Sequence, residues 1–215
     1  MPPSFVLLLA MKTPLAILCV VLLAACNTKQ NTPVIAIQPI GKVSADKITV
    51  VKHALNSVYH YQVLVLPAIQ PPQQAYVNIK TPRYRADKLI AYLKDIKPDT
   101  VDYIMGLTGY DISITKKDMF GRIKEPQSRY EDFGIFGLGY MPGKSCVVSY
   151  YRLGNSIATL HNRLAKIGVH ELGHNLGLNH CTNKTCVMAD AVEKISTIDN
   201  AEMKLCGGCK KSTAF

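Results

Sequence analysis

The chain contains no tryptophan, and its acidic residues are few compared with its basic ones. No repeat of roughly 20 to 50 residues is visible, which argues against solenoids and propellers. Fifteen Asp and Glu side chains stand against 25 Lys and Arg, so the formal charge is +10. The basic residues are scattered and do not alternate with aromatic ones, which argues against a nucleic-acid partner and favours a solvated basic surface.

Apolar residues make up 48% of the chain and charged residues 19%. This balance supplies enough material for a packed core and excludes a disordered or collagen-like chain. A length of 215 residues suits one ordinary domain and is short for two. The cysteines number seven, so they do not all pair with one another as disulfides.

The single long apolar run, residues 5–25, is laid out like a secretory signal. Lys12 follows a second possible start at Met11, a short apolar core comes next, and Leu23-Ala24-Ala25 then precedes Cys26. This ending resembles the lipobox of bacterial lipoproteins, which implies that Cys26 carries a lipid. An N-terminal anchor helix that is never cleaved is the alternative, because the run is long enough to span a membrane.

Either interpretation predicts an exported protein attached to a membrane. We expect a signal peptide over 1–25, a short polar tether over 26–33 and one folded domain over 34–215. Asn27 is not the aspartate that often retains lipoproteins in the inner membrane, so the expected location is the bacterial outer membrane or the cell surface.

Strand and helix patterns alternate along the first part of the domain, which predicts the α/β class. Residues 116–132 are polar and charged and are expected to form a long surface loop. Strands are expected over 34–40, 61–66, 101–108, 112–115, 133–141 and 146–153, and helices over 45–58, 85–96 and 155–178.

The helix expected over 155–178 carries the residues with the clearest chemistry. At about 100° per residue, His170 and His174 project from the same side of the helix and can share one metal ion. Gly177 can adopt the left-handed conformation that ends a helix, which would return His180 as a third ligand. Three nitrogen ligands leave a fourth position open, as in catalytic zinc sites.

This motif predicts hydrolysis of a peptide bond. Zinc lowers the pKa of its water, and Glu171 lies beside the histidines, where it can act as the general base on that water. Two exposed histidines without a ligand are the alternative, but they leave Gly177 and His180 unexplained. His161, His53 and His60 fall outside the pattern and are expected to be ordinary histidines.

The cysteines follow the third histidine at regular spacings. The whole string, HExxHxxGxxHCx4CxMx17CxxC, resembles the signature of the archaemetzincins, a branch of the metzincin metallopeptidases. Weaker similarity extends to segments 108–111 and 149–153. The resemblance implies two zinc ions per chain, the second a structural one held by Cys181, Cys186, Cys206 and Cys209.

Four thiolates in two close pairs also suit a closed tetrahedral site on chemical grounds. Disulfides within the two pairs, Cys181–Cys186 and Cys206–Cys209, are the alternative in an oxidising compartment. Cys146 stands alone in a strand and is expected to be a small buried apolar residue.

The resemblance further implies a zincin fold of α/β (α+β) type: a twisted mixed sheet, a backing helix, an active-site helix and a small C-terminal subdomain. Met188 matches the methionine of the family's Met-turn, which packs beneath the catalytic zinc. Segment 133–140 is our candidate for the edge strand that binds an extended peptide, because its glycines suit a strand that another backbone approaches closely. A membrane-attached zinc-containing binding lipoprotein with little or no turnover is the alternative function.

Overall fold

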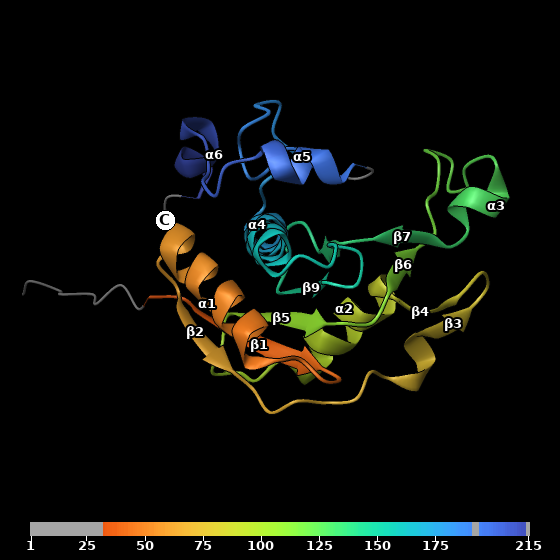
Figure 1. The fold of residues 1–215 in the computed structure, drawn as a ribbon, viewed down its shortest axis with the longest axis horizontal. Helices are drawn as coiled ribbons and strands as arrows, with labels where there is room; N and C mark the ends of the chain where they lie inside the picture. The colour runs from red at the N-terminus through yellow and green to blue at the C-terminus, as the bar shows by residue number, and fades with distance from the viewer. Residues whose placement is uncertain (1–31, 191–193, 214–215) are drawn as a thin grey trace, which may run out of the picture. The chain divides into compact units, whose positions relative to one another are not determined.

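Two β-sheets and the helices packed on them make up the part of the protein that the computed structural model describes, residues 32–190 and 194–213 (Figure 1). The helices are α1 (Ala45–Tyr59), α2 (Ala86–Ile96), α3 (Gln127–Tyr130), α4 (Ile157–Asn175), α5 (Ile195–Asn200) and α6 (Gly207–Ser212), with a short 3-10 helix at Gln73–Ala75. The strands are β1 (Val34–Ile40), β2 (Gln62–Val65), β3 (Tyr76–Asn78), β4 (Pro82–Arg85), β5 (Tyr103–Thr108), β6 (Ile112–Ile114), β7 (Phe133–Ile135), β8 (Gly137–Gly139) and β9 (Ser145–Ser149).

The larger sheet has five strands in the order β2-β1-β5-β9-β8. All neighbours in it are parallel except β8 and β9, which are antiparallel. Its central strands are almost continuously apolar because helices cover both faces. Successive side chains of β1 point to opposite faces of the sheet. Ile35 and Ile37 belong to the core that α1 and α4 cover, whereas Ala36 belongs to the core that α2 covers.

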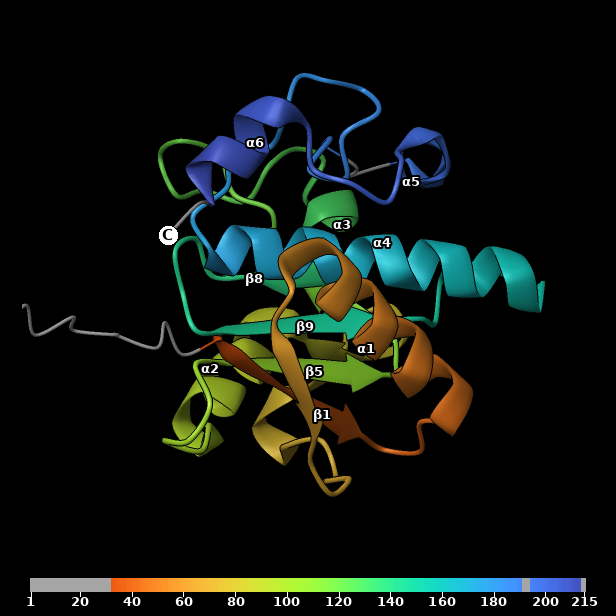
Figure 2. The same ribbon diagram turned by 90° about the vertical axis from the view of Figure 1, so that its left-hand side faces the viewer.

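Helices α1 and α4 pack on each other above this sheet (Figure 2). Tyr59, at the end of α1, donates a hydrogen bond of 2.8 Å from its hydroxyl to the Val169 carbonyl on α4. Leu164, Val169 and Leu172 of α4 are fully buried, as expected for a central helix. The larger sheet therefore supports α4 from below, and α1 supports it from the side.

A second, four-stranded sheet has the order β3-β4-β6-β7, and it corrects one prediction. Residues 133–141 were expected to form one strand, but β7 lies at the edge of the second sheet and β8 at the edge of the first. The chain changes sheets at Phe136, between the glycines at 134 and 137. The single mixed sheet that we expected is therefore divided in two.

A buried cluster of charges joins the second sheet to the segment after β9. Asp111 accepts hydrogen bonds from Arg83 (2.7 Å) and from Arg152 (2.6 Å). Arg83 also bonds Asp132 at 2.9 Å, and the side chains of both aspartates are almost completely buried. The segments at 108–111 and 149–153, noted in the sequence, meet at this cluster.

Residues beyond α4 form a small C-terminal part with α5 and α6, which Figure 1 shows above α4. Among the described residues, no helix has the length and apolar character that crossing a bilayer requires. The predicted signal peptide, Cys26 and most of the tether lie outside the described residues, so the lipid anchor stays a prediction.

Candidate metal centres

Helix α4 and the turn that follows it place the three predicted histidines. The helix begins after Ser156, whose side chain makes no capping bond, and ends at Asn175, three residues earlier than expected. Gly177 has a φ of +88°, and its N–H donates to the His174 carbonyl at 2.9 Å. The predicted left-handed glycine is confirmed, and the turn brings His180 back over the helix.

Three imidazole rings converge at this point. The Nε2 atoms of His170 and His174 are 3.0 Å apart, and the ring centroids of the three histidines lie 4.6, 4.9 and 5.3 Å from one another. One nitrogen of each ring lies within 4.8 Å of the others. Zinc–nitrogen distances of about 2.0–2.1 Å in a tetrahedral site separate the nitrogens by about 3.4 Å, so this group fits a zinc ion.

Backbone carbonyls orient two of the rings. The Nδ1 atom of His170 is 2.8 Å from the Val187 carbonyl, and that of His174 is 2.8 Å from the Leu178 carbonyl. A carbonyl only accepts, so each Nδ1 carries the proton and each Nε2 keeps a free lone pair. Burial lowers the pKa of His170 to about 4 and also lowers the pKa of His174. Both rings are therefore neutral at physiological pH, as zinc ligands must be.

Glu171 lies beside this triad and is 7% exposed. Burial raises the pKa of its carboxyl to about 8. A Cβ atom on Gly137 would come within 2.6 Å of the Glu171 carboxylate, and one on Gly139 within 2.8 Å of the Glu171 carbonyl. We expected these glycines where another backbone approaches closely. At Gly139 that backbone is helix α4, whereas at Gly137 the close neighbour is the Glu171 side chain.

The outer edge of β8 is open along the same site. Bonds to β9 are made at the Phe136 carbonyl and the Tyr140 N–H. Because hydrogen-bonded pairs alternate in an antiparallel ladder, the N–H and C=O groups of Gly137 and Gly139 point away from β9. The edge strand therefore offers free backbone groups next to Glu171.

A cavity of about 280 Å³ opens beside the triad. Lys166 lies on its wall, and its Nζ donates to the carbonyls of Ile198 (2.9 Å) and Asp199 (3.1 Å). The histidine motif did not predict this lysine, although its place four residues before His170 sets it on the same helical face. The cavity's apolar wall includes Ile114, Ile135, Leu138, Ile167, Val187 and Ile198.

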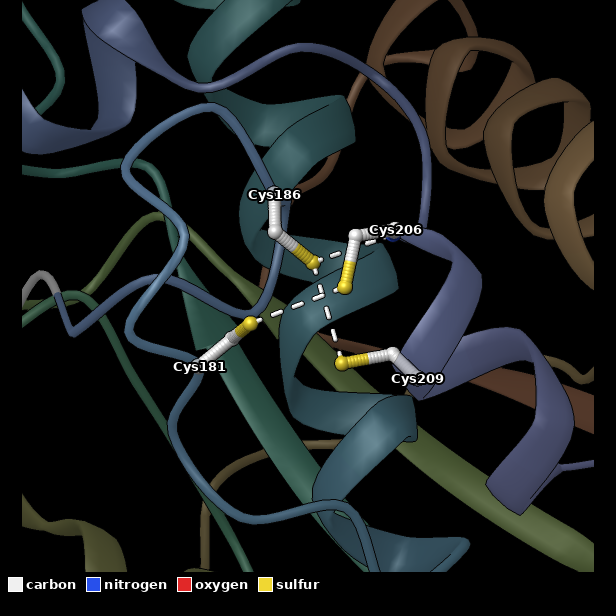
Figure 3. A group of neighbouring side chains, drawn as sticks. All are labelled: Cys181, Cys186, Cys206 and Cys209. Atoms are coloured by element: carbon white, nitrogen blue, oxygen red, sulfur yellow. Dashed lines mark hydrogen bonds between the residues drawn. The ribbon is translucent and has the colours of Figure 1, made fainter.

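The four predicted cysteines also meet, and Figure 3 shows their side chains pointing toward one another. The Cys181 and Cys206 sulfurs are 3.7 Å apart, and those of Cys186 and Cys209 are 3.8 Å apart. Zinc–sulfur bonds of about 2.3 Å in a tetrahedron separate the sulfurs by about 3.8 Å, so the cluster fits zinc. All four are free thiols in the structure, which does not contain the alternative pair of disulfides.

One short segment links the two centres. Cys181 follows His180 directly, and its N–H donates to the Met188 carbonyl at 2.8 Å. Met188 is fully buried under α4, where it packs against Gly173. A hydrogen bond from the backbone N–H of Cys209 lowers the pKa of Cys206 to about 7, whereas burial raises the pKa of Cys209, so the thiolate at Cys206 is favoured over that at Cys209.

The remaining histidine and cysteine of interest behave as ordinary side chains. His161 is 2.8 Å from the Asp46 carboxylate and belongs to neither metal-binding group of the described residues. Cys146 is completely buried within β9, as predicted.

Comparisons with known proteins agree with this geometry. The model of peptidase family M54 matches residues 47–214. The archaemetzincin of Haloarcula marismortui is 33% identical over 186 residues, which cover 82% of this chain and 96% of the relative.

Solved structures show the same fold. The crystal structure of archaemetzincin from Archaeoglobus fulgidus, complexed with malonate, has a TM-score of 0.65 and 26% identity, covering 83% of this chain and 99% of that one. The archaemetzincin structure from Methanopyrus kandleri has a TM-score of 0.69 and 22% identity, covering 84% of this chain and 92% of that one. The chain therefore belongs to peptidase family M54, the archaemetzincins, and is a zinc-dependent metallopeptidase whose histidine triad and four-cysteine cluster fit a catalytic and a structural zinc ion.

Proposed function

We propose that Glu171 is the general base of this peptidase and that His170, His174 and His180 hold the catalytic zinc. The convergence of three imidazoles beside one buried carboxylate is the observation that carries the proposal. When bound, zinc polarises the scissile carbonyl and lowers the pKa of water. Glu171 takes the proton from the attacking water and passes it to the departing amine.

Burial prepares Glu171 for both proton transfers. Burial alone favours the protonated carboxyl, which helps Glu171 hold the proton that it takes from the water. The positive charge of a bound zinc ion would lower this pKa again and favour the carboxylate that acts as the base. The carboxyl lines the same cavity as the three histidines. Gly137 leaves it room, because any larger residue there would overlap the carboxylate.

The substrate is an extended peptide that pairs with the open edge of β8. Free backbone groups at Gly137 and Gly139 would bond the peptide main chain, which is the usual mode of strand addition. The adjacent cavity of about 280 Å³ would receive one large apolar side chain of that peptide. Peptides with leucine, phenylalanine or methionine next to the scissile bond are therefore the expected substrates.

A comparison of the wild-type protein with Glu171→Gln tests this assignment. Glutamine keeps the shape of the side chain but does not accept the proton. We expect zinc binding to persist and peptide turnover to fall at least about a hundredfold. Equal turnover by both proteins would reject Glu171 as the base. Loss of zinc from the variant would indicate that Glu171 is a zinc ligand instead.

We further propose Met188 as the packing floor beneath the catalytic zinc. It is fully buried, it contacts Gly173 between two of the histidines, and its carbonyl accepts from Cys181. We also propose Cys181, Cys186, Cys206 and Cys209 as the structural zinc ligands, and the distances of 3.7 and 3.8 Å between their sulfurs support this.

We also propose that the protein is a lipoprotein, anchored through Cys26 in the outer membrane or at the cell surface of a bacterium. The arrangement of one charge, an apolar core and Leu23-Ala24-Ala25-Cys26 supports this. Metabolic labelling with a radioactive fatty acid tests it. Wild-type protein should take up the label and Cys26→Ala should not. An unlabelled, uncleaved protein in the membrane fraction would establish an anchor helix instead.

A further inference from the structure

A tight turn between β6 and α3 presents two large apolar side chains to solvent. Met119 is 91% exposed and Phe120 is 74% exposed, which makes them the two most exposed large apolar residues among those described. Residues in the centre of a tight turn are usually polar or small. Neither side chain contributes to the core, so folding does not account for them.

The turn is held in one conformation by its own bonds. Its backbone is closed by Gly121 N–H donating to the Asp118 carbonyl (3.1 Å) and by Asp118 N–H donating to the Arg122 carbonyl (2.8 Å). The Asp118 carboxylate accepts from the N–H groups of Phe120 (2.9 Å) and Arg122 (3.0 Å). Gly121 has a φ of +79°, which suits the residue after such a turn. The apolar tip is therefore preorganised and does not need to fold when it binds.

Positive charges surround the base of this tip. Residues 116–125 hold four basic side chains against two acidic ones, Asp118 and Glu125. Lys117, Arg122 and Lys124 are exposed, and Arg122 forms an ion pair with Asp118 at 2.9 Å, so the two lysines supply the uncompensated charge. Lys80, between β3 and β4, lies against α3, which follows the hairpin, because its Nζ donates to the Arg129 carbonyl at 3.2 Å. An apolar tip with cations behind it matches a layer of anionic headgroups above hydrocarbon.

We infer that the hairpin at residues 116–124 inserts Met119 and Phe120 into a bilayer that contains anionic phospholipid. A bilayer accepts a convex apolar tip without a shaped pocket, whereas a protein partner would have to supply one. The predicted mature chain has 24 basic and 15 acidic side chains, since residues 1–25 contain only Lys12, and its net charge of +9 favours the same surface. This contact does not depend on the zinc chemistry.

Insertion would also orient the peptidase site. The strands that flank the hairpin, β6 and β7, contribute Ile114 and Ile135 to the wall of the cavity. Figure 1 shows α3 and the adjoining loops at the end of the molecule opposite α1. The inserted hairpin would therefore set the distance between the cavity and the bilayer. It would do so independently of the N-terminal tether.

The test uses the chain from Asn27 to Phe215, which has neither signal nor lipid. This part folds by itself, because a solved relative consists almost entirely of the matching region, 99% of its length. Vesicles contain either phosphatidylcholine alone or roughly two thirds phosphatidylcholine and one third phosphatidylglycerol. We expect the zinc-loaded chain to sediment with the anionic vesicles and to remain in solution with the neutral ones.

Removal of the apolar tip should weaken this binding. Full burial of a side chain as large as Met or Phe changes a partition constant roughly ten- to hundredfold, so Met119→Ser with Phe120→Ser should lose at least about tenfold. Lys117→Gln and Lys124→Gln should each lose roughly fivefold on anionic vesicles. Zinc content and turnover of a soluble peptide should be unchanged in all of them, which verifies folding.

The absence of tryptophan permits a direct measurement of insertion. Phe120→Trp places the chain's single tryptophan at the tip. Its emission, excited selectively over that of the tyrosines, should shift to the blue and be quenched by brominated lipid when anionic vesicles are added. Ile157→Trp is the matched control, because Ile157 is 72% exposed at the start of α4 and its fluorophore should remain in water.

Three outcomes would overturn the inference. They are failure of the wild-type chain to bind anionic vesicles, binding that the tip variants leave unchanged, and a blue shift for Ile157→Trp as large as that for Phe120→Trp. Either of the first two outcomes would mean that the exposed tip binds a protein or binds nothing.

Discussion

Replacement of Gly173 by alanine tests how tightly α4 is packed over Met188. Gly173 lies between His170 and His174 on the buried side of the helix. An added Cβ would overlap the Met188 sulfur and would lie 3.0 Å from both the Met188 methyl carbon and the Tyr59 hydroxyl. Met188 is fully buried, and the Tyr59 hydroxyl is already bonded to α4. Neither neighbour can move without disturbing the packing around the histidines.

Opposing effects decide the size of the change. Alanine stabilises a helix interior by about 1 kcal/mol relative to glycine. Overpacking of a filled core costs about 1–3 kcal/mol, and loss of the Tyr59 hydrogen bond costs about 1 kcal/mol more. The overpacking and the lost bond outweigh the helix propensity, so Gly173→Ala should lower the free energy of unfolding by about 1–3 kcal/mol.

Gly168 offers a matched control on the same helix. A Cβ there would lie 3.3 Å from a Val51 methyl group and 3.9 Å from the Met105 sulfur, so little has to move. We expect Gly168→Ala to be neutral or to stabilise the protein by up to about 1 kcal/mol. The two variants carry the same substitution, and they differ in the space that the structure leaves for it.

Urea unfolding in the same zinc-containing buffer gives the free energy of unfolding of both variants. Zinc content and peptide turnover are measured on the same samples. Displaced Met188 would also move Val187, whose carbonyl orients His170, so Gly173→Ala should lose turnover as well. The loss of stability should be smaller in a Met188→Ala background, because the clash is then absent. A Gly173→Ala protein as stable and as active as Gly168→Ala would refute this description of the packing.

Three further outcomes follow from the structure. Cys206→Ser should reduce the zinc content from two ions per chain to one, and it should weaken peptide turnover because the cysteine cluster adjoins His180. Cys146→Ala, outside the cluster, should keep both ions, and elemental analysis measures the zinc content of the two variants. Asp111→Asn should cost about 2 kcal/mol or more in thermal unfolding, since it leaves two arginines without their shared carboxylate. The pKa of Asp46 lies below its ordinary 3.8, chiefly because its carboxylate accepts a hydrogen bond from Ser44. The ionised carboxylate therefore stabilises the protein above pH 3.8, and this contribution is lost as the pH falls below that value. The difference in free energy of unfolding between the wild type and Asp46→Asn should shrink in acid, and a difference that does not change with pH would contradict this.

Much of the fold was predictable because local patterns and tertiary packing agree. The strand at 34–40 and the helix at 45–58 appear with almost the expected bounds. Their apolar spacing is also the spacing that buries them, so sequence and environment give the same answer. The short strands β3 and β4 were missed, since three or four half-exposed residues carry too little periodicity to predict a strand.

Residues 133–141 show the opposite case. Their pattern predicts one strand, but its two halves pair with different neighbours, β6 and β9. Hydrogen bonds to distant segments decide where a strand ends, and those partners do not appear in a local window. The glycines at 137 and 139 show the same limitation, because their role depends on the approach of α4.

The sequence by itself determined that the three histidines converge, because helical periodicity brings His170 and His174 together and a left-handed glycine returns His180. Those constraints act within eleven residues and need no tertiary information. Only the tertiary structure decided the surroundings: the burial that raises the pKa of Glu171, the apolar cavity with Lys166 on its wall, and the exposed hairpin at 116–124. Burial and exposure depend on segments far apart in the chain, and folding alone brings those segments into contact or leaves them in solvent.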